Sequence, residues 1–206
     1  MLRGMRLGFI GPCRGDVDAL RPLAELLLFD LRATRVVYLG ADDALDRAVR
    51  GWPERLGTPP DEKGFLTEAA LLARDAPADV LEALVDRDRK LQRLADLAAL
   101  PPPPARAVEM FDDRVVIMTF DKGVLDEEDV ANASAIVWGN SRDPQLRGIG
   151  PRAFLSPGWI TAPAGPHVGV IDQTDDAIVC TLRDKKGAVV QEHRIALARA
   201  GKMGVQ

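Results

Sequence analysis

A glycine-rich loop near the amino terminus carries side chains that could do chemistry. Cys13, Arg14 and Asp16 lie close together, directly after a short apolar run that ends at Ile10. An arginine guanidinium can offer two parallel N–H groups to a phosphate or a carboxylate. A thiol beside such a cation can have a lowered pKa, but no histidine lies nearby in the sequence to act as a base. The loop therefore favours an internal ion pair or a bound anion over nucleophilic catalysis.

Further polar residues follow two later apolar runs. Asp42 comes after Arg35–Gly40, and Asn140 and Arg142 come after Ala135–Gly139. The chain has two histidines, and both fall in predicted carboxyl-terminal hairpins, at His167 and His193. A hydrolytic metal centre needs several carboxylate or imidazole ligands for each ion. We therefore expect no metal ion and no other cofactor.

The bulk composition predicts a globular protein with an ordinary core. The chain has 206 residues, of which 47% are hydrophobic and 28% charged, and its formal net charge is -4. This acidic balance argues against nucleic acid as a partner. No apolar run reaches the roughly 18 residues that cross a bilayer, so we expect no membrane insertion. Two cysteines, Cys13 and Cys180, suit a reducing compartment, and we expect a cytoplasmic location.

The amino-terminal part predicts a βαβ unit. Leu7–Ile10 and Arg35–Gly40 have the apolar runs of buried strands, and Asp16–Leu31 has apolar residues at helical spacing. Asp16 or Asp18 would cap this helix. Because a strand, a helix and a second strand follow one another so closely, we expect the sheet to begin parallel.

The rest of the chain predicts a helical segment and then further strands. Helices are expected at Phe65–Arg74 and Pro77–Leu100, and the prolines of 101–104 end this segment. The elements expected after it are a strand at Arg114–Phe120, a helix at Glu127–Ala133, a strand at Ala135–Gly139, and antiparallel strands at Ala153–Leu155, His167–Ile171, Ala177–Leu182 and Ala188–Leu197. Asp184–Gly187 predicts the turn of the last hairpin.

The order of these strands and turns resembles the calcineurin-like metallophosphoesterases. The likeness is greatest to their small bacterial phosphodiesterase branch and to the retromer subunit of that fold, and the shared scaffold residues are Gly15, Gly40, Gly139 and Pro157–Gly158. The resemblance implies an α/β protein, a four-layer α/β/β/α sandwich with mixed sheets and a helical insert. It also implies one domain over residues 1–206, a divergent helical insert at residues 52–104 and a flexible tail at residues 198–206.

In the family, five signature blocks hold two metal ions at the carboxyl ends of the strands. The ligands of the first block correspond here to Pro12 and Arg14, although Gly15 and Asp16 remain. The bridging aspartate of the second block corresponds to Ala41, with Asp42 one residue away.

The remaining blocks depart from the family in the same way. The third block has no match, the histidine of the fourth corresponds to Phe120, and the two histidines of the fifth correspond to Asn140 and Arg142. Proline, alanine and phenylalanine offer no ligand atom, and a guanidinium is a permanent cation. The resemblance therefore implies a remnant pocket without a metal site.

This pattern is typical of a pseudoenzyme. We expect a non-catalytic protein-interaction scaffold or regulatory subunit with a protein partner, and self-association into a homo-oligomer is a second option. The candidate surfaces are the Pro77–Leu100 helix and a patch around Trp138, Trp159 and Ile160.

Three alternatives remain open. One is a metal-dependent phosphoesterase with a remodelled site that uses Asp16, Asp42 and Asn140. Another is an anion- or nucleotide-sensing module that uses Arg14 and Arg142. The third, a dinucleotide-binding loop at residues 8–15, ranks lower because the G-x-G-x-x-G spacing is not met and Pro12 removes an amide.

Overall fold

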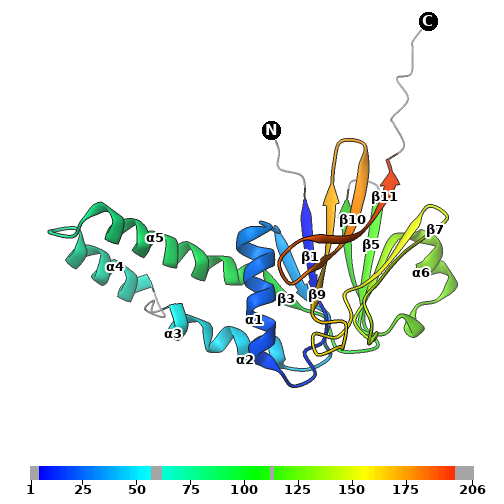
Figure 1. Ribbon diagram of the computed structural model, residues 1–206, viewed down its shortest axis with the longest axis horizontal. Coiled ribbons are helices and arrows are strands. Elements are labelled where there is room, and N and C mark those ends of the chain that lie inside the picture. Colours follow the sequence, from blue (N-terminus) through cyan, green and yellow to red (C-terminus); the bar gives the residue numbers. More distant parts are fainter. Residues whose placement is uncertain (1–4, 57–61, 112–113, 198–206) are drawn as a thin grey trace, which may run out of the picture.

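Two mixed β-sheets packed face to face form the body of the protein (Figure 1). The structure is a computed structural model that describes residues 5–56, 62–111 and 114–197. The first sheet has the strand order β11 (Val189–Ala196), β10 (Ala177–Asp184), β9 (His167–Gln173), β1 (Arg6–Ile10), β2 (Arg35–Tyr38) and β3 (Leu97–Ala99). The second has the order β4 (Ala107–Phe111), β5 (Arg114–Thr119), β6 (Ala133–Trp138), β8 (Arg152–Ser156) and β7 (Gln145–Ile149).

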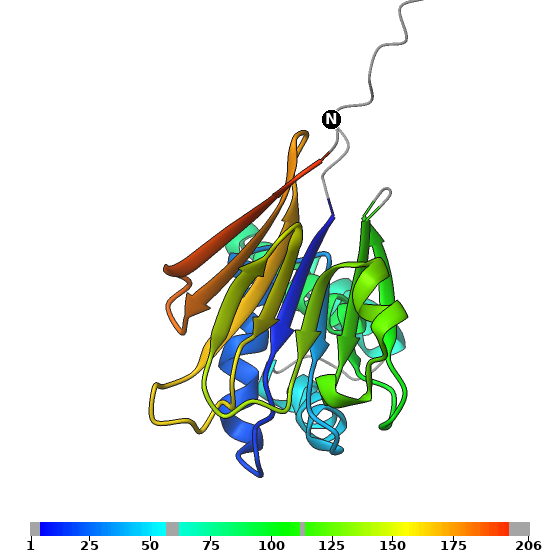
Figure 2. The same cartoon turned by 90° about the vertical axis from the view of Figure 1, so that its right-hand side faces the viewer.

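Helices cover the outer faces of both sheets. Helix α1 (Val17–Glu25), the π-helix that continues it (Leu26–Asp30) and α2 (Ala44–Arg50) lie on the first sheet (Figure 1). Helix α6 (Glu127–Asn132) lies on the second sheet, on the side away from the first (Figure 2), and the 3-10 turn η3 (Lys122–Val124) precedes it. This arrangement is the predicted four-layer α/β/β/α sandwich. None of the helices in the described ranges has the length and apolar character that a membrane span requires.

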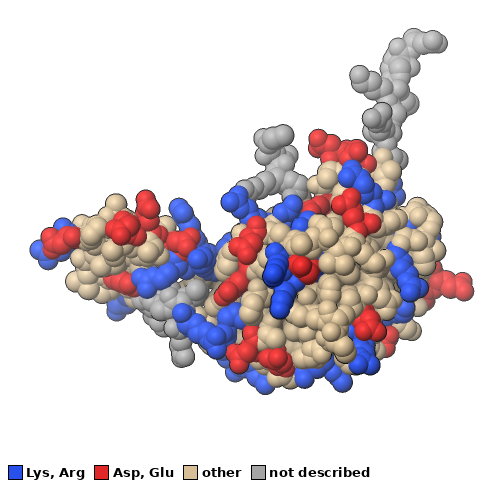
Figure 3. Space-filling model, in the orientation of Figure 1, with Lys and Arg blue, Asp and Glu red and all other residues tan. Residues whose placement is uncertain are grey.

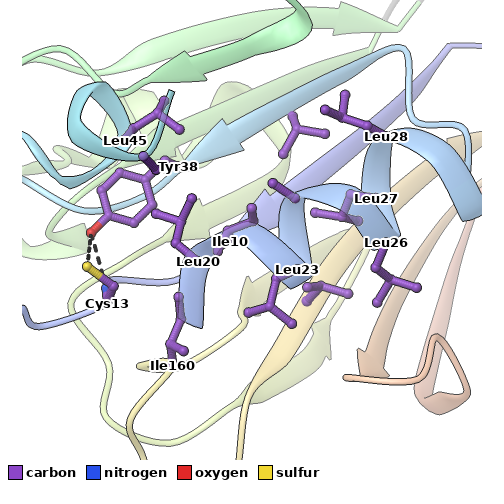
Figure 4. Close-up of a cluster of buried hydrophobic side chains, with 14 of the residues drawn as sticks. Ile10, Cys13, Leu20, Leu23, Leu26, Leu27, Leu28, Tyr38, Leu45 and Ile160 are labelled. Atoms are coloured by element: carbon purple, nitrogen blue, oxygen red, sulfur yellow. Dashed lines mark hydrogen bonds between the residues drawn. The ribbon is translucent and has the colours of Figure 1, made fainter. Parts of the chain in front are cut away.

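Each layer boundary contains its own apolar cluster. The largest buries one face of α1 and the π-helix against the first sheet, with Leu20, Leu23 and Leu27 beside Ile10 (Figure 4). A second cluster fills the space between the sheets, and a third lies under α6. The parallel pairing of β1 with β2 confirms the predicted βαβ unit. The side chain of Asp16 caps α1 by accepting a hydrogen bond from the Ala19 amide, at 3.1 Å.

Three helices form an arm that extends away from the body (Figure 1). They are α3 (Trp52–Leu56), α4 (Glu62–Leu72) and α5 (Ala78–Arg93). Helices α4 and α5 contact each other, with an ion pair between Glu68 and Arg87, at 2.7 Å, and Leu84 of α5 is buried. The opposite face of α4 leaves Leu66 57% exposed and Leu71 70% exposed.

Several local predictions are wrong. The helix predicted at Pro77–Leu100 ends at Arg93, where a 3-10 turn (η2, Leu94–Asp96) leads into strand β3. Strand β8 pairs parallel with β6 and belongs to the second sheet, so it is not part of an antiparallel carboxyl-terminal sheet. Trp138 and Ile160 are buried and cannot form the predicted surface patch. The predicted tail at residues 198–206 lies outside the described residues.

The buried thiol of Cys180 predicts a loss of stability at alkaline pH. Burial, together with the negative charge of Asp172, raises the pKa of Cys180 to about 12. The folded protein therefore keeps this proton at pH values where the unfolded chain, with a usual thiol pKa near 9, releases it. Its contribution to stability is complete below about pH 9 and falls by about 1.4 kcal/mol for each further pH unit, until the folded thiol also ionises. Urea unfolding at several pH values should show a shallower alkaline decline for Cys180→Ala, and equal slopes would contradict this.

Candidate functional site

The candidate site lies where strands of both sheets end. The loops after β1, β2, β5, β6 and β8 meet at one edge and contact each other through their backbones. A Cβ atom added to Gly11 would lie 1.7 Å from the carbonyl oxygen of Gly158, and one added to Gly139 would lie 2.0 Å from that of Leu39. Glycine is required at both positions because the neighbouring atom belongs to backbone. The predicted site residues are thus brought to one edge, in closely packed loops.

A buried tyrosine connects the loops after β1 and β2 (Figure 4). The amide of Cys13 donates a hydrogen bond to the hydroxyl of Tyr38, at 3.1 Å, and this hydroxyl donates to Oδ1 of Asp42, at 2.8 Å. The Sγ atom of Cys13 lies 3.4 Å from the same hydroxyl. Burial, followed by the contact with the Cys13 side chain, raises the pKa of Tyr38 well above its usual value. The hydroxyl therefore stays protonated and holds the two loops together.

The carboxylates at this edge are engaged in local hydrogen bonds. Asp16 caps α1, and Asp42 accepts from Tyr38 and from the amide of Ala44, at 3.3 Å. Asp121 accepts from the amide of Gly123, at 2.9 Å, and from the side-chain amide of Asn140, at 3.1 Å. Each carboxylate thus orders the loop or helix that follows its strand.

The cations at this edge contact aromatic rings. The guanidinium of Arg14 lies 4.5 Å from the ring centre of Trp159, and the ammonium of Lys122 lies 4.7 Å from that of Trp138. Arg142 contributes a backbone bond, since its carbonyl accepts from the amide of Trp159, at 3.1 Å. Among the described residues, neither Arg14 nor Arg142 forms an ion pair with a carboxylate. The internal ion pair expected for the loop that carries Arg14 and Asp16 is therefore not formed, because Arg14 stacks on Trp159 and Asp16 caps α1.

The two mixed sheets, the outer helices and the site at the carboxyl ends define a metallophosphoesterase-like fold. No protein-family model and no curated protein sequence matches the chain. Among solved structures, a predicted phosphoesterase from Streptococcus pneumoniae is similar, with 12% identity, a TM-score of 0.54 and coverage of 96% of this chain and 100% of the other.

Two further solved structures have the same fold. Vacuolar protein sorting 29 from Cryptosporidium parvum is 13% identical, with a TM-score of 0.52 and coverage of 96% of this chain and 100% of the other. GAP50 of Plasmodium is 9% identical, with a TM-score of 0.50 and coverage of 96% and 90%. At these identities the likeness establishes the fold alone.

The residues at the edge do not fit the two metal ions that this fold family implies. Pro12 is buried and its carbonyl accepts the amide of Ile160, at 3.0 Å, while Ala41 and Phe120 have no ligand atom. Within the described ranges, no group of three or more His, Cys, Asp and Glu side chains could hold a metal ion. The donor set is therefore too poor for an ion that would activate water.

The hydroxyl of Tyr38 predicts a measurable stability effect. Tyr38→Phe removes this hydroxyl and leaves the buried amide of Cys13 without its partner. We expect the free energy of unfolding to fall by about 1 to 2 kcal/mol. Urea denaturation of both proteins measures the difference, and unchanged stability would mean that the hydroxyl does not connect the loops.

Sequence reasoning missed Tyr38 and the backbone contact between Leu39 and Gly139. Tyr38 lies inside an apolar strand, so its pattern predicts core packing and gives no sign of a hydrogen bond to Cys13. Its one signal is that it is the single tyrosine of the chain. The Leu39–Gly139 contact joins different sheets, and no local pattern reports such a contact.

Proposed function

We propose that this chain is a non-catalytic protein of the phosphoesterase fold that acts as a protein-interaction scaffold or regulatory subunit. The observation that carries the proposal is that the carboxylates at the strand ends are engaged in local hydrogen bonds. Asp16, Asp42 and Asp121 each accept local hydrogen bonds, Asn140 donates one of them to Asp121, and the ligand positions of Pro12, Arg14, Ala41, Phe120 and Arg142 hold residues that cannot coordinate. Metal-assisted hydrolysis needs a bound ion with an activated water, and among the described residues this edge offers no cluster of three or more His, Cys, Asp or Glu side chains that could hold an ion, and no histidine base.

The helical arm supports the scaffold role. Its helix α4 exposes Leu66 and Leu71 on the face turned away from α5, and an exposed apolar face of this kind is typical of a protein contact. We propose that residues 52–104 are an insert that carries this surface in a single domain. GAP50, which has the same fold, is described as the anchor in the inner membrane complex of Plasmodium.

A cytoplasmic location is part of the proposal, supported by two buried, unbridged cysteines.

Turnover of a chromogenic phosphodiester in the presence of Mn²⁺ tests the catalytic half of the proposal. We expect a rate equal to that of buffer with Mn²⁺, for the wild-type chain and for Asp42→Ala alike. Turnover that Asp42→Ala abolishes would overturn the proposal. It would support the alternative of a remodelled phosphoesterase that uses Asp16, Asp42 and Asn140.

Affinity capture from an extract of the source organism tests the scaffold half. The double variant Leu66→Glu/Leu71→Glu should lose a protein that the wild-type chain retains in stoichiometric amount. Val108→Glu is the matched control, because Val108 is 51% exposed on the separate surface of β4. Equal capture by all three proteins would show that the arm does not bind the partner.

A further inference from the structure

A groove lies at the amino ends of the central strands, at the opposite edge from the loops described above. One hollow of about 460 Å³ is lined by residues from the starts of β1 and β2, the end of β9 and the end of α5. An adjoining hollow of about 730 Å³ lies between the π-helix and α5. Arg32 and Arg93 line both, so the hollows form one groove. Volumes of this size are typical of sites for small molecules.

The groove has an excess of positive charge in an acidic protein. Its three carboxylates are all paired with cations, in the pairs Arg6–Asp172, Lys90–Asp86 and Arg93–Asp96. Arg32 and Arg89 remain, and neither has an ion-pair partner among the described residues. Lys and Arg atoms gather where the arm meets the body (Figure 3). The groove therefore has two cations free to meet an anion.

The backbone at Arg32 is unusual for its residue type. Arg32 has φ of 54°, in the left-handed region that residues other than glycine rarely adopt. It follows the π-helix Leu26–Asp30, an element found frequently at functional sites. Glycine would fit this conformation without strain, so an arginine at this position carries a conformational cost.

The side chains near Arg32 are suited to bind a phosphate group that is attached to an apolar group. Arg93 is fixed by its ion pair with Asp96, at 2.6 Å, and by a bond to the carbonyl of Ala33, which orients its guanidinium before a ligand arrives. The second hollow is lined by the half-buried Phe29, and the ammonium of Lys90 lies 5.9 Å from the Phe29 ring. We propose that this groove binds a small phosphate monoester, with its phosphate on the unpaired Arg32, beside the oriented guanidinium of Arg93, and its apolar part against Phe29.

Calorimetric titration of the full chain at low ionic strength tests this site, with adenosine monophosphate, glucose 6-phosphate, inorganic phosphate and sulfate as probes. We expect adenosine monophosphate to bind most tightly, because its base can lie against Phe29, and sulfate most weakly. No binding by either phosphate ester at millimolar concentration would overturn the proposal. Equal affinities for inorganic phosphate and adenosine monophosphate would overturn the assignment of Phe29 as the contact for the apolar part.

Three variants distinguish a specific binding site at Arg32 from nonspecific electrostatic attraction. Arg32→Gln should weaken binding of adenosine monophosphate by about tenfold, the equivalent of one charged hydrogen bond. Arg147→Gln removes an exposed arginine on β7 and should leave the affinity unchanged. Arg32→Gly should lose binding as Arg32→Gln does, with a melting temperature no lower than that of the wild type, because glycine relieves the backbone strain. Equal losses for Arg32→Gln and Arg147→Gln, or full binding by Arg32→Gly, would contradict the site.

Discussion

Trp52→Ala is expected to lower the free energy of unfolding by about 4 kcal/mol. The Trp52 side chain is fully buried at the base of the arm, where it joins the cluster between α1 and the first sheet. Its indole N–H donates to Oε1 of Glu25, at 3.2 Å, and the guanidinium of Arg21 lies 5.5 Å from its ring centre. Truncation leaves a cavity and removes these contacts at the point where the arm leaves the body.

Urea denaturation followed by circular dichroism measures the effect of Trp52→Ala. Leu66→Ala is the control within the same arm, because Leu66 is 57% exposed and its truncation should change stability by less than about 0.5 kcal/mol. A loss of stability for Trp52→Ala as small as that of Leu66→Ala would show that the packing of Trp52 does not stabilise the base of the arm.

Gly139→Ala is expected to lower the free energy of unfolding by about 3 kcal/mol. Its Cβ would lie 2.0 Å from the carbonyl oxygen of Leu39 and 3.0 Å from the Leu39 Cβ. Because the first of these is a backbone atom, no rotamer change relieves the clash, and the two sheet edges must move apart. The amide of Gly139 also bonds the carbonyls of Thr119 and Phe120, both at 3.1 Å, so the loop cannot shift freely.

Gly51→Ala is the matched control for Gly139→Ala. Gly51 has φ of -85° and no atom closer than 4.0 Å to an added Cβ. Its replacement should leave stability unchanged or raise it by about 0.5 kcal/mol, since alanine restricts the unfolded chain. Equal stability of the Gly139→Ala and Gly51→Ala proteins would contradict the close contact between the sheets.

The central strands were predictable because each is a continuous apolar run with a clear end. Leu7–Ile10 and Arg35–Gly40 have this pattern, and both form neighbouring parallel strands. Strand β3 was not predictable, since Leu97 continues the helical spacing of Leu91 and Leu94 and becomes a strand through its pairing with β2. The edge strands β4 and β7 were not predicted because their sequences mix polar and apolar residues. The contact of Gly148 in β7 with the His193 ring of β11 joins the two sheets and leaves no local pattern in the sequence.

The location of the candidate site could be predicted from the sequence, but the side-chain contacts within it could not. The resemblance placed Pro12, Ala41, Phe120, Asn140 and Arg142 after successive strands, and the structure brings these loops to one edge. Sequence spacing could not report that Arg14 would stack on Trp159 or that Tyr38 would donate to Asp42. These contacts join residues from different elements and depend on how those elements pack.

Metal content tests the central claim most directly. The purified chain is equilibrated with Mn²⁺ and Zn²⁺, freed of unbound metal by gel filtration and analysed by mass spectrometry of the elements. We predict less than about 0.1 ion per chain, since the strand-end edge lacks the ligands that a two-metal centre needs. Retention of about two ions per chain, lost in Asp42→Ala, would contradict the account.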